Sequence, residues 1–273
     1  MKSISTSART ARLRLPLNRS RSRPRHDRYA RVDGVRVRYV EAGAEHGGVP
    51  LVIVHGYNGS CDYWYPQTVL GLAERRHVIA VDLPGNGLSG KLSAHNLETL
   101  SDFIVRFVET LGFERADLMG HSMGGLLAIA AAVARPDRAR SLVLVDSAGL
   151  PDLVKHLWLV PVVALADSSM RQWRFYPTFI KIGMRARTKR ECLEMVSKVS
   201  IREMLSRLEL PVFVLWGERD RVVPVEHGYY MAEHIAGAQL AVVEGVGHMP
   251  FYEKPAECNR LILDFIEGLE QQT

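Results

Sequence analysis

The amino-acid sequence of 273 residues predicts an α/β fold, in which helices cover a mostly parallel β-sheet. Three observations support this class. Short and mostly unbroken apolar runs recur along the chain, as in strands that are buried on both faces. Segments with the apolar spacing of helices lie between these runs. The composition, 47% hydrophobic and 24% charged, is that of a globular protein. We therefore expect one large domain, or one domain with an insertion.

The expected strands begin with a hairpin. Two alternating runs, Tyr29–Val32 and Val35–Val40, flank Asp33-Gly34, a dipeptide that favours a tight turn between antiparallel strands. The strands that follow are predicted from the apolar runs Leu51–Val54, Val78–Val81, Asp117–Met119, Leu142–Val145, Val212–Leu215 and Leu240–Val243.

Helices are expected between and after these strands. In residues 97–111 the apolar side chains repeat every three or four positions, and Gly112 ends the run. A second helical pattern covers Leu261–Leu269. The interval 147–210 is far longer than an ordinary connection between strands, so we interpret it as an inserted helical cap. The α/β core would then comprise residues 29–146 and 211–273.

Residues 1–28 form a basic tail. Nine Lys and Arg residues against one acid give the tail a charge of +8, whereas the rest of the chain carries 26 basic and 29 acidic side chains, a charge of −3. The tail is rich in Arg and Ser and its apolar residues are scattered, so we expect it to stay disordered. Because the folded body is slightly acidic, we expect no nucleic-acid partner for it, and such a role would rest on the tail alone.

Three further features bear on the compartment. The tail lacks the apolar core of a secretory signal, although an organellar transit peptide has a similar composition. No window of 18 apolar residues occurs, so no transmembrane helix is predicted. Cys61, Cys192 and Cys258 are far apart and form no CxxC pair, as is typical of reduced thiols. We therefore expect a cytoplasmic protein, or an imported one if the tail is a transit peptide.

The clearest chemical motif is Gly120-His121-Ser122-Met123-Gly124-Gly125. It follows the predicted strand Asp117–Met119 and opens onto the small-residue helical run Leu126–Ala134. This is G-x-S-x-G in a strand–turn–helix context, where the glycines permit a sharp turn that exposes the serine oxygen. The helix that follows directs backbone amides at the same point. Ser122 is therefore the candidate nucleophile.

A serine hydroxyl needs an imidazole to take its proton and a carboxylate to orient that imidazole. His248 lies in a glycine-rich loop after the last predicted strand and is the only one of ten histidines in that position. Asp220 follows the preceding strand, which gives the chain order Ser122, Asp220, His248. Asp146, at the end of another predicted strand, is a rival for the acid. We favour Asp220 because a capping or loop role accounts for Asp146.

From residue 29 to residue 270 the chain resembles the α/β-hydrolase family, in the form that carries a cap. The resemblance is carried by segments at strand ends: His55-Gly56, Asp82–Ser89, Gly120–Gly125, Trp216–Asp220, and Gly247-His248 followed by Glu253-Lys254-Pro255. It implies a mostly parallel sheet of eight strands whose first strands are antiparallel, with the cap between the sixth and seventh strands. It also implies that the backbone N–H groups of Tyr57 and Met123 form an oxyanion hole. The lipase-type HGGG sequence is absent.

A serine nucleophile separates the chain from the haloalkane dehalogenases and soluble epoxide hydrolases that it resembles, which use aspartate. We expect a carboxylesterase or lipase-like hydrolase of small to medium hydrophobic esters that needs no metal or cofactor. The cap segment Leu157–Ala166 is apolar all round, which suits either a pocket for an acyl or alkyl group or packing on the sheet. Two alternatives stay open: a C–C bond hydrolase of a diketone-type aromatic degradation product, and a ligand receptor with slow turnover.

Other motifs are weaker. Residues 85–90 match G-x-G-x-x-G, but Pro84 precedes them and no apolar helix follows at once, so we do not expect dinucleotide binding. His227 and His234 lack the spacing of metal ligands. Four arginines of the expected cap suit either an anionic substrate or, more commonly, a solvated face: Arg171, Arg174, Arg185 and Arg187.

Overall fold

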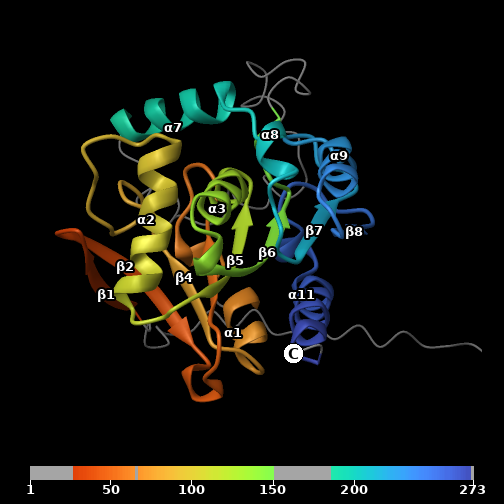
Figure 1. The fold of residues 1–273 in the computed structure, drawn as a ribbon, viewed down its shortest axis with the longest axis horizontal. Helices are drawn as coiled ribbons and strands as arrows, with labels where there is room; N and C mark the ends of the chain where they lie inside the picture. The colour runs from red at the N-terminus through yellow and green to blue at the C-terminus, as the bar shows by residue number, and fades with distance from the viewer. Residues whose placement is uncertain (1–26, 65–66, 151–185, 272–273) are drawn as a thin grey trace, which may run out of the picture.

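The computed structural model describes residues 27–64, 67–150 and 186–271 (Figure 1). The tail before residue 27 lies outside this part of the chain. So do residues 151–185 of the expected cap, which include the apolar segment Leu157–Ala166 and the arginines Arg171, Arg174 and Arg185.

Eight strands form one sheet in the order β1-β2-β4-β3-β5-β6-β7-β8. Their bounds are β1 Asp27–Val32, β2 Val35–Ala42, β3 Leu51–Val54, β4 Val78–Val81, β5 Ala116–His121, β6 Ala139–Val145, β7 Val212–Gly217 and β8 Gln239–Val243. β2 pairs antiparallel with both β1 and β4, and all other neighbours are parallel. The predicted α/β class and the antiparallel start of the sheet are confirmed.

Two strands differ from the sequence-based expectation. β1 begins at Asp27, before the apolar run, because Asp27 pairs in register with Val40 of β2. β8 was predicted as a strand buried on both faces, but Leu240, Ala241 and Val242 are only partly buried. The reason is position: β8 lies at the edge of the sheet and pairs with β7 alone among the described strands.

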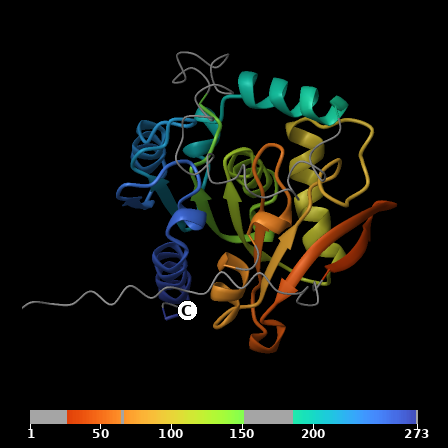
Figure 2. The ribbon, with the colours of Figure 1, turned by 180° about the vertical axis from the view of Figure 1, so that it is seen from behind.

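Helices cover the two faces of the sheet, as Figure 2 shows from the opposite side to Figure 1. The α-helices are α1 Gln67–Ala73, α2 Leu97–Thr110, α3 Met123–Ala134, α7 Ala186–Lys198, α8 Arg202–Leu205, α9 Glu226–His234, α10 Pro250–Glu253 and α11 Pro255–Glu270. Short 3-10 helices are η1 Ala44–His46, η2 Cys61–Tyr63 and η3 Pro136–Arg138. α2 packs on α3, and α1 packs on α11.

The alternation of side chains along each strand divides the core into two layers. Val52 and Val54 of β3 belong to the apolar cluster that includes α2 and α3, whereas Leu51 and Ile53 belong to the cluster that includes α1 and α11. A strand covered by helices on both faces therefore needs an unbroken apolar run, which is why β3 and β4 were predictable to the residue.

The carboxyl ends of the parallel strands share one edge of the sheet. His55 follows β3, Asp82 follows β4, and Ser122 follows β5. The motifs singled out above thus lie in loops of the same edge, where α/β folds place their sites.

Helix α7 is the largest described part of the interval 147–210, and it crosses the end of the molecule near the start of α2 (Figure 1). Arg187 Nη2 donates a hydrogen bond to the Ser93 carbonyl oxygen at 2.8 Å, and Glu191 Oε2 lies 2.8 Å from His95 Nδ1. Hydrogen bonds from Arg187 and then from His95 lower the pKa of Glu191 to about 2. Arg187 is therefore engaged in holding α7 to the loop before α2. No described helix has the length and apolar character to cross a membrane.

A buried arginine ties the first strands to the loops behind the site. Arg38 of β2 is fully buried and its guanidinium contacts three carboxylates: Asp27 at 2.8 Å, Asp62 at 2.7 Å and Asp82 at 3.2 Å. Asp82 also accepts hydrogen bonds from the backbone N–H groups of Cys61 and Leu88. Arg38 thus joins β1, η2 and the loop after β4.

Replacing Arg38 with methionine is expected to lower the free energy of unfolding by about 3–5 kcal/mol, because three carboxylates, one of them fully buried, lose their common counter-charge. Urea unfolding followed by circular dichroism measures this loss. Arg36→Met is the matched control, because Arg36 is an exposed residue of the same strand and stacks on Tyr29, a contact worth about 0.5–1 kcal/mol. Equal losses in the two variants would contradict the central role of Arg38.

Candidate functional site

Ser122 occupies a sharp turn between β5 and α3. Its φ of 53° is a left-handed conformation that is unusual for a residue other than glycine. The turn is possible because glycines stand two positions before and two positions after Ser122: a Cβ on Gly120 would lie 2.3 Å from Gly124 O, and a Cβ on Gly124 would lie 2.3 Å from Val54 O. Hydrogen bonds of its backbone N–H and C=O maintain this strained conformation. Ser122 N donates to Val145 O and Ser122 O accepts from Ala148 N, each at 3.0 Å.

Asp220 and His248 form a buried hydrogen-bonded pair. His248 Nδ1 lies 2.7 Å from Asp220 Oδ2, and the Asp220 side chain has no exposed surface. The other carboxylate oxygen accepts hydrogen bonds from the backbone N–H groups of Val222 and Val223 at 2.7 and 2.9 Å. Asp220 therefore has one oxygen fixed by the backbone and the other directed at the imidazole.

The loops that carry this pair are fastened to each other. Arg219 N donates to Val246 O at 2.8 Å, and Glu218 N donates to Val243 O at 3.0 Å. A Cβ on Gly217 would lie 2.1 Å from Gly247 O, so only glycine lets the loop after β8 approach β7 this closely. These contacts set the register between Asp220 and His248.

Asp146, the rival acid, lies beside the pair. Oxygen or nitrogen atoms of Asp146, Asp220 and His248 lie within 4.8 Å of one another, the one group of three possible metal ligands among the residues described. Asp146 Oδ1 accepts a hydrogen bond from Gly217 N at 2.8 Å. Asp146 thereby fixes the end of β7, just before the loop that carries Asp220. Asp220 and His248 are themselves joined by a hydrogen bond.

The peptide that joins Gly56 to Tyr57 is oriented by His55. His55 is fully buried, and its Nε2 accepts a hydrogen bond from Leu83 N at 3.0 Å. The proton is therefore on Nδ1, which donates to Gly56 O at 2.8 Å. Burial lowers the pKa of His55, in agreement with a neutral ring. Because the C=O and N–H of a trans peptide point in opposite directions, the bond to Gly56 O also fixes the direction of the Tyr57 N–H.

The second expected oxyanion donor lies at a helix start. Met123 is the first residue of α3, so its backbone N–H has no acceptor within the helix. Tyr57 is 36% exposed, and burial, with a smaller contribution from Cys192 of α7, raises the pKa of its phenol. The oxyanion hole formed by the backbone N–H groups of Tyr57 and Met123 stays a prediction.

Close contacts bring these loops together. A Cβ on Gly56 would lie 3.0 Å from the Cβ of Ser122 and 2.9 Å from Nδ1 of His121. The His121 and His248 rings have centroids 4.7 Å apart. The structure therefore gathers the loops after β3, β5 and β8, and Asp220 joins them through His248.

Two buried residues of this region, Tyr63 and His121, were not predicted as functional. Tyr63 Oη accepts a hydrogen bond from Gly56 N at 2.6 Å, and His121 Nε2 lies 2.8 Å from the carbonyl oxygen of His248. No periodic apolar pattern marks η2, which contains Tyr63. His121 occupied a variable position of the G-x-S-x-G motif, where residue type carries no information by itself.

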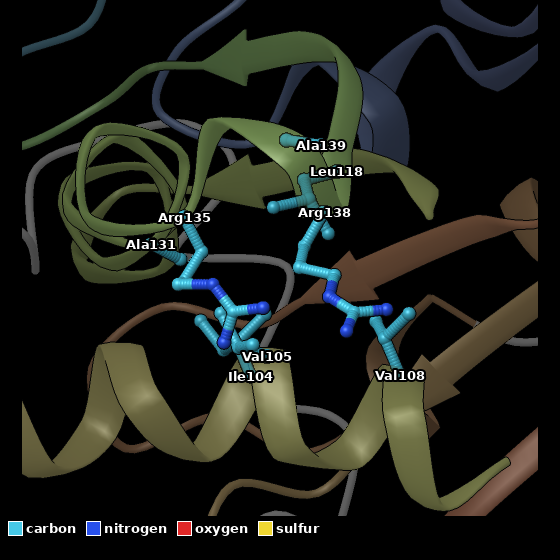
Figure 3. Close-up of a pocket in the computed structure, with 8 residues that line it drawn as sticks. All are labelled: Ile104, Val105, Val108, Leu118, Ala131, Arg135, Arg138 and Ala139. Carbon is cyan, nitrogen blue, oxygen red and sulfur yellow. The ribbon is translucent and has the colours of Figure 1, made fainter. Parts of the chain in front are cut away.

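Other features lie away from this site. No helix follows residues 85–90 until α2 begins at Leu97, so the glycine motif lacks the helix start that binds a dinucleotide. Figure 3 shows a crevice between α2, α3 and the start of β6, lined in part by Arg135 and Arg138. Both arginines form ion pairs with Glu109 of α2. The crevice leaves no room for a water-sized sphere and therefore cannot hold a ligand.

Comparisons with known proteins agree with the fold. The dihydrolipoyllysine-residue acetyltransferase component of the acetoin cleaving system of Pseudomonas putida is 32% identical over 87% of this chain and 68% of its own length. The pimeloyl-[acyl-carrier protein] methyl ester esterase of Neisseria meningitidis is 26% identical over 80% of this chain and 94% of its own length. The 2-hydroxymuconate semialdehyde hydrolase of a Pseudomonas species is 27% identical over 92% of this chain and 97% of its own length.

The family assignment comes from the match to a family model. Residues 51–261, which run from β3 into α11, match the model of the alpha/beta hydrolase family. This range includes the Ser122 turn and both members of the Asp220–His248 pair. The chain therefore belongs to the alpha/beta hydrolase family and is a hydrolase.

Proposed function

We propose that the chain is a serine hydrolase that cleaves carboxylic esters with small to medium hydrophobic groups, through Ser122, His248 and Asp220. The observation that carries the proposal is the buried hydrogen bond of 2.7 Å between His248 Nδ1 and Asp220 Oδ2, at the sheet edge where Ser122 takes its strained turn. Such a bond fixes the imidazole tautomer whose Nε2 accepts a proton.

In the proposed reaction, Ser122 Oγ attacks the ester carbonyl while His248 Nε2 takes its proton. Asp220 stabilises the imidazolium that forms, because its carboxylate is held beside Nδ1 by the backbone amides of Val222 and Val223. The proton passes to the leaving alcohol, and an acyl-enzyme remains. Water activated by the same imidazole then releases the acid and restores the serine.

The negative oxygen of the tetrahedral intermediate would be held by the backbone N–H groups of Tyr57 and Met123. The direction of the first is fixed through His55, and the second begins α3, whose dipole favours negative charge. One such donor is typically worth about 10²–10³ in rate. No step of this scheme uses a metal or a cofactor, and the substrate is a small hydrophobic ester.

Two relatives point to other reactions that the same site could perform. The 2-hydroxymuconate semialdehyde hydrolase supports a second candidate, cleavage of a C–C bond in a diketone-type compound. The acetyltransferase component supports transfer of the acyl group to an acceptor other than water. The esterase relative favours hydrolysis of an ester, which we place first.

The test is hydrolysis of p-nitrophenyl esters from acetate to palmitate by the purified full chain, with fluorophosphonate labelling in parallel. We expect turnover that is highest for short to medium acyl groups, and labelling of Ser122. Labelling without ester turnover would favour the C–C hydrolase or a receptor. Absence of labelling would overturn the proposed function, because the serine would not be activated.

A further inference from the structure

Behind the proposed site, a chain of polar contacts runs through three loops. Gly56 N donates to Tyr63 Oη at 2.6 Å, Tyr63 Oη lies 3.5 Å from His121 Nδ1, and His121 Nε2 lies 2.8 Å from His248 O. Three points along this series of contacts are adjacent to proposed catalytic groups. Gly56 precedes Tyr57, His121 precedes Ser122, and the last acceptor is the backbone of His248 itself.

We propose that Tyr63 and His121 are positioning residues, whose side chains form one hydrogen-bonded relay that holds the oxyanion loop, the nucleophile turn and the His248 loop in register. This inference rests on the function proposed above. Neither side chain is assigned contact with the substrate.

The direction of each hydrogen bond follows from the groups involved. The His248 carbonyl can only accept, so His121 Nε2 carries the proton and its Nδ1 has the lone pair. Tyr63 Oη accepts from Gly56 N–H and keeps its own hydrogen, which it can direct at that lone pair. All donors along the relay are thereby matched with acceptors, from the Gly56 amide to the His248 carbonyl.

This order of donors requires a neutral His121, and the surroundings of the ring keep it neutral. His121 is 4% exposed, and burial lowers its pKa well below the usual value, with the neighbouring His248 adding to the effect. Burial likewise raises the pKa of Tyr63, which keeps its hydroxyl protonated. The relay therefore keeps one pattern of protons while His248 gains and loses its own proton during turnover.

The relay is anchored independently of the substrate. Tyr63 belongs to η2, which is held in place by the hydrogen bond from Cys61 N to Asp82 and by the Asp62–Arg38 ion pair. Its ring is packed against Trp64 and Phe251, with centroids 5.5 and 5.9 Å away. Phe251 also meets the edge of His121, at 5.0 Å. The phenol oxygen is therefore a fixed point from which the other loops are placed.

Tyr63→Phe removes only the oxygen and retains the ring packing. We expect kcat for p-nitrophenyl esters to fall about 10- to 100-fold with KM changed less than about threefold, because the reacting groups lose their register while the substrate pocket keeps its walls. Tyr39→Phe is the matched control: Tyr39 is another buried tyrosine, packed against Phe107 in the core, and its variant should keep the wild-type kcat.

Substitutions at His121 test the far end of the relay. Gln offers an amide N–H in place of Nε2–H, whereas Leu offers none, so His121→Gln should retain more activity than His121→Leu. If Tyr63 and His121 act as one unit, the double variant Tyr63→Phe/His121→Leu should lose no more kcat than His121→Leu alone. If the two side chains only pack and act independently, the fold-losses in kcat of the single variants should multiply in the double variant.

The rate of fluorophosphonate labelling of Ser122 provides a second readout that does not depend on the choice of ester. Wild-type labelling with unaltered rates in Tyr63→Phe and His121→Leu would overturn the relay and leave the proposed function intact. Multiplying effects in the double variant would also overturn it. Absence of both labelling and turnover in the wild type would overturn the proposed function, and the relay with it.

Discussion

Ser122→Ala is expected to lower kcat for ester hydrolysis by about 10⁶-fold, the scale of loss that follows removal of the nucleophile from a serine triad. The loss should be large because His248 and Asp220 contribute only by activating and stabilising the serine, so their contributions vanish with it. The substitution removes one oxygen and leaves the strained turn, which is built by backbone hydrogen bonds and glycines. The variant should therefore fold like the wild type.

Parallel measurement of p-nitrophenyl ester turnover, fluorophosphonate labelling and thermal unfolding checks this expectation. Ser101→Ala is a suitable control, because Ser101 is also buried but donates to the Glu98 carbonyl in α2, away from the strand ends. Full activity of Ser122→Ala in a preparation free of other esterases would refute the assignment of the nucleophile.

Much of the fold was predictable because its central strands are covered on both faces. The runs in β3 and β4 are apolar without interruption, and every residue of both strands is buried. The α2 prediction at 97–111 was confirmed at Leu97–Thr110 because its apolar side chains repeat at helical spacing. Prediction was weaker for β8, the last strand of the sheet. β8 is only partly buried, so its apolar run did not indicate burial on both faces.

The candidate site could be proposed from the sequence only where chemistry requires a residue type at a chain position. Ser122 stands out because the turn needs glycines around it, and Asp220 and His248 stand out because they follow strand ends. The contacts of Tyr63 and His121 join loops that are distant in sequence, and a single sequence contains no signal for such contacts. The Arg38 cluster likewise joins carboxylates from three separate segments.

Asp220→Asn is expected to lower kcat by about 10⁴-fold by imposing the wrong tautomer on His248. The side-chain oxygen of the asparagine would stay with the backbone N–H groups of Val222 and Val223, because both are donors. Its NH₂ group would then face His248 Nδ1, which would have to accept a hydrogen bond. The ring proton would move to Nε2, and His248 could no longer take the proton from Ser122.

The same substitution at Asp146 separates the two acids. Asp146→Asn keeps an oxygen that can accept from Gly217 N and leaves the Asp220–His248 bond in place. We therefore expect it to cost less than about tenfold in kcat, the scale of a single weakened hydrogen bond. Steady-state kinetics of both variants decides the matter. A greater loss in Asp146→Asn than in Asp220→Asn would transfer the role of the triad acid to the end of β6, because only the carboxylate that holds the proton on Nδ1 controls the basicity of Nε2.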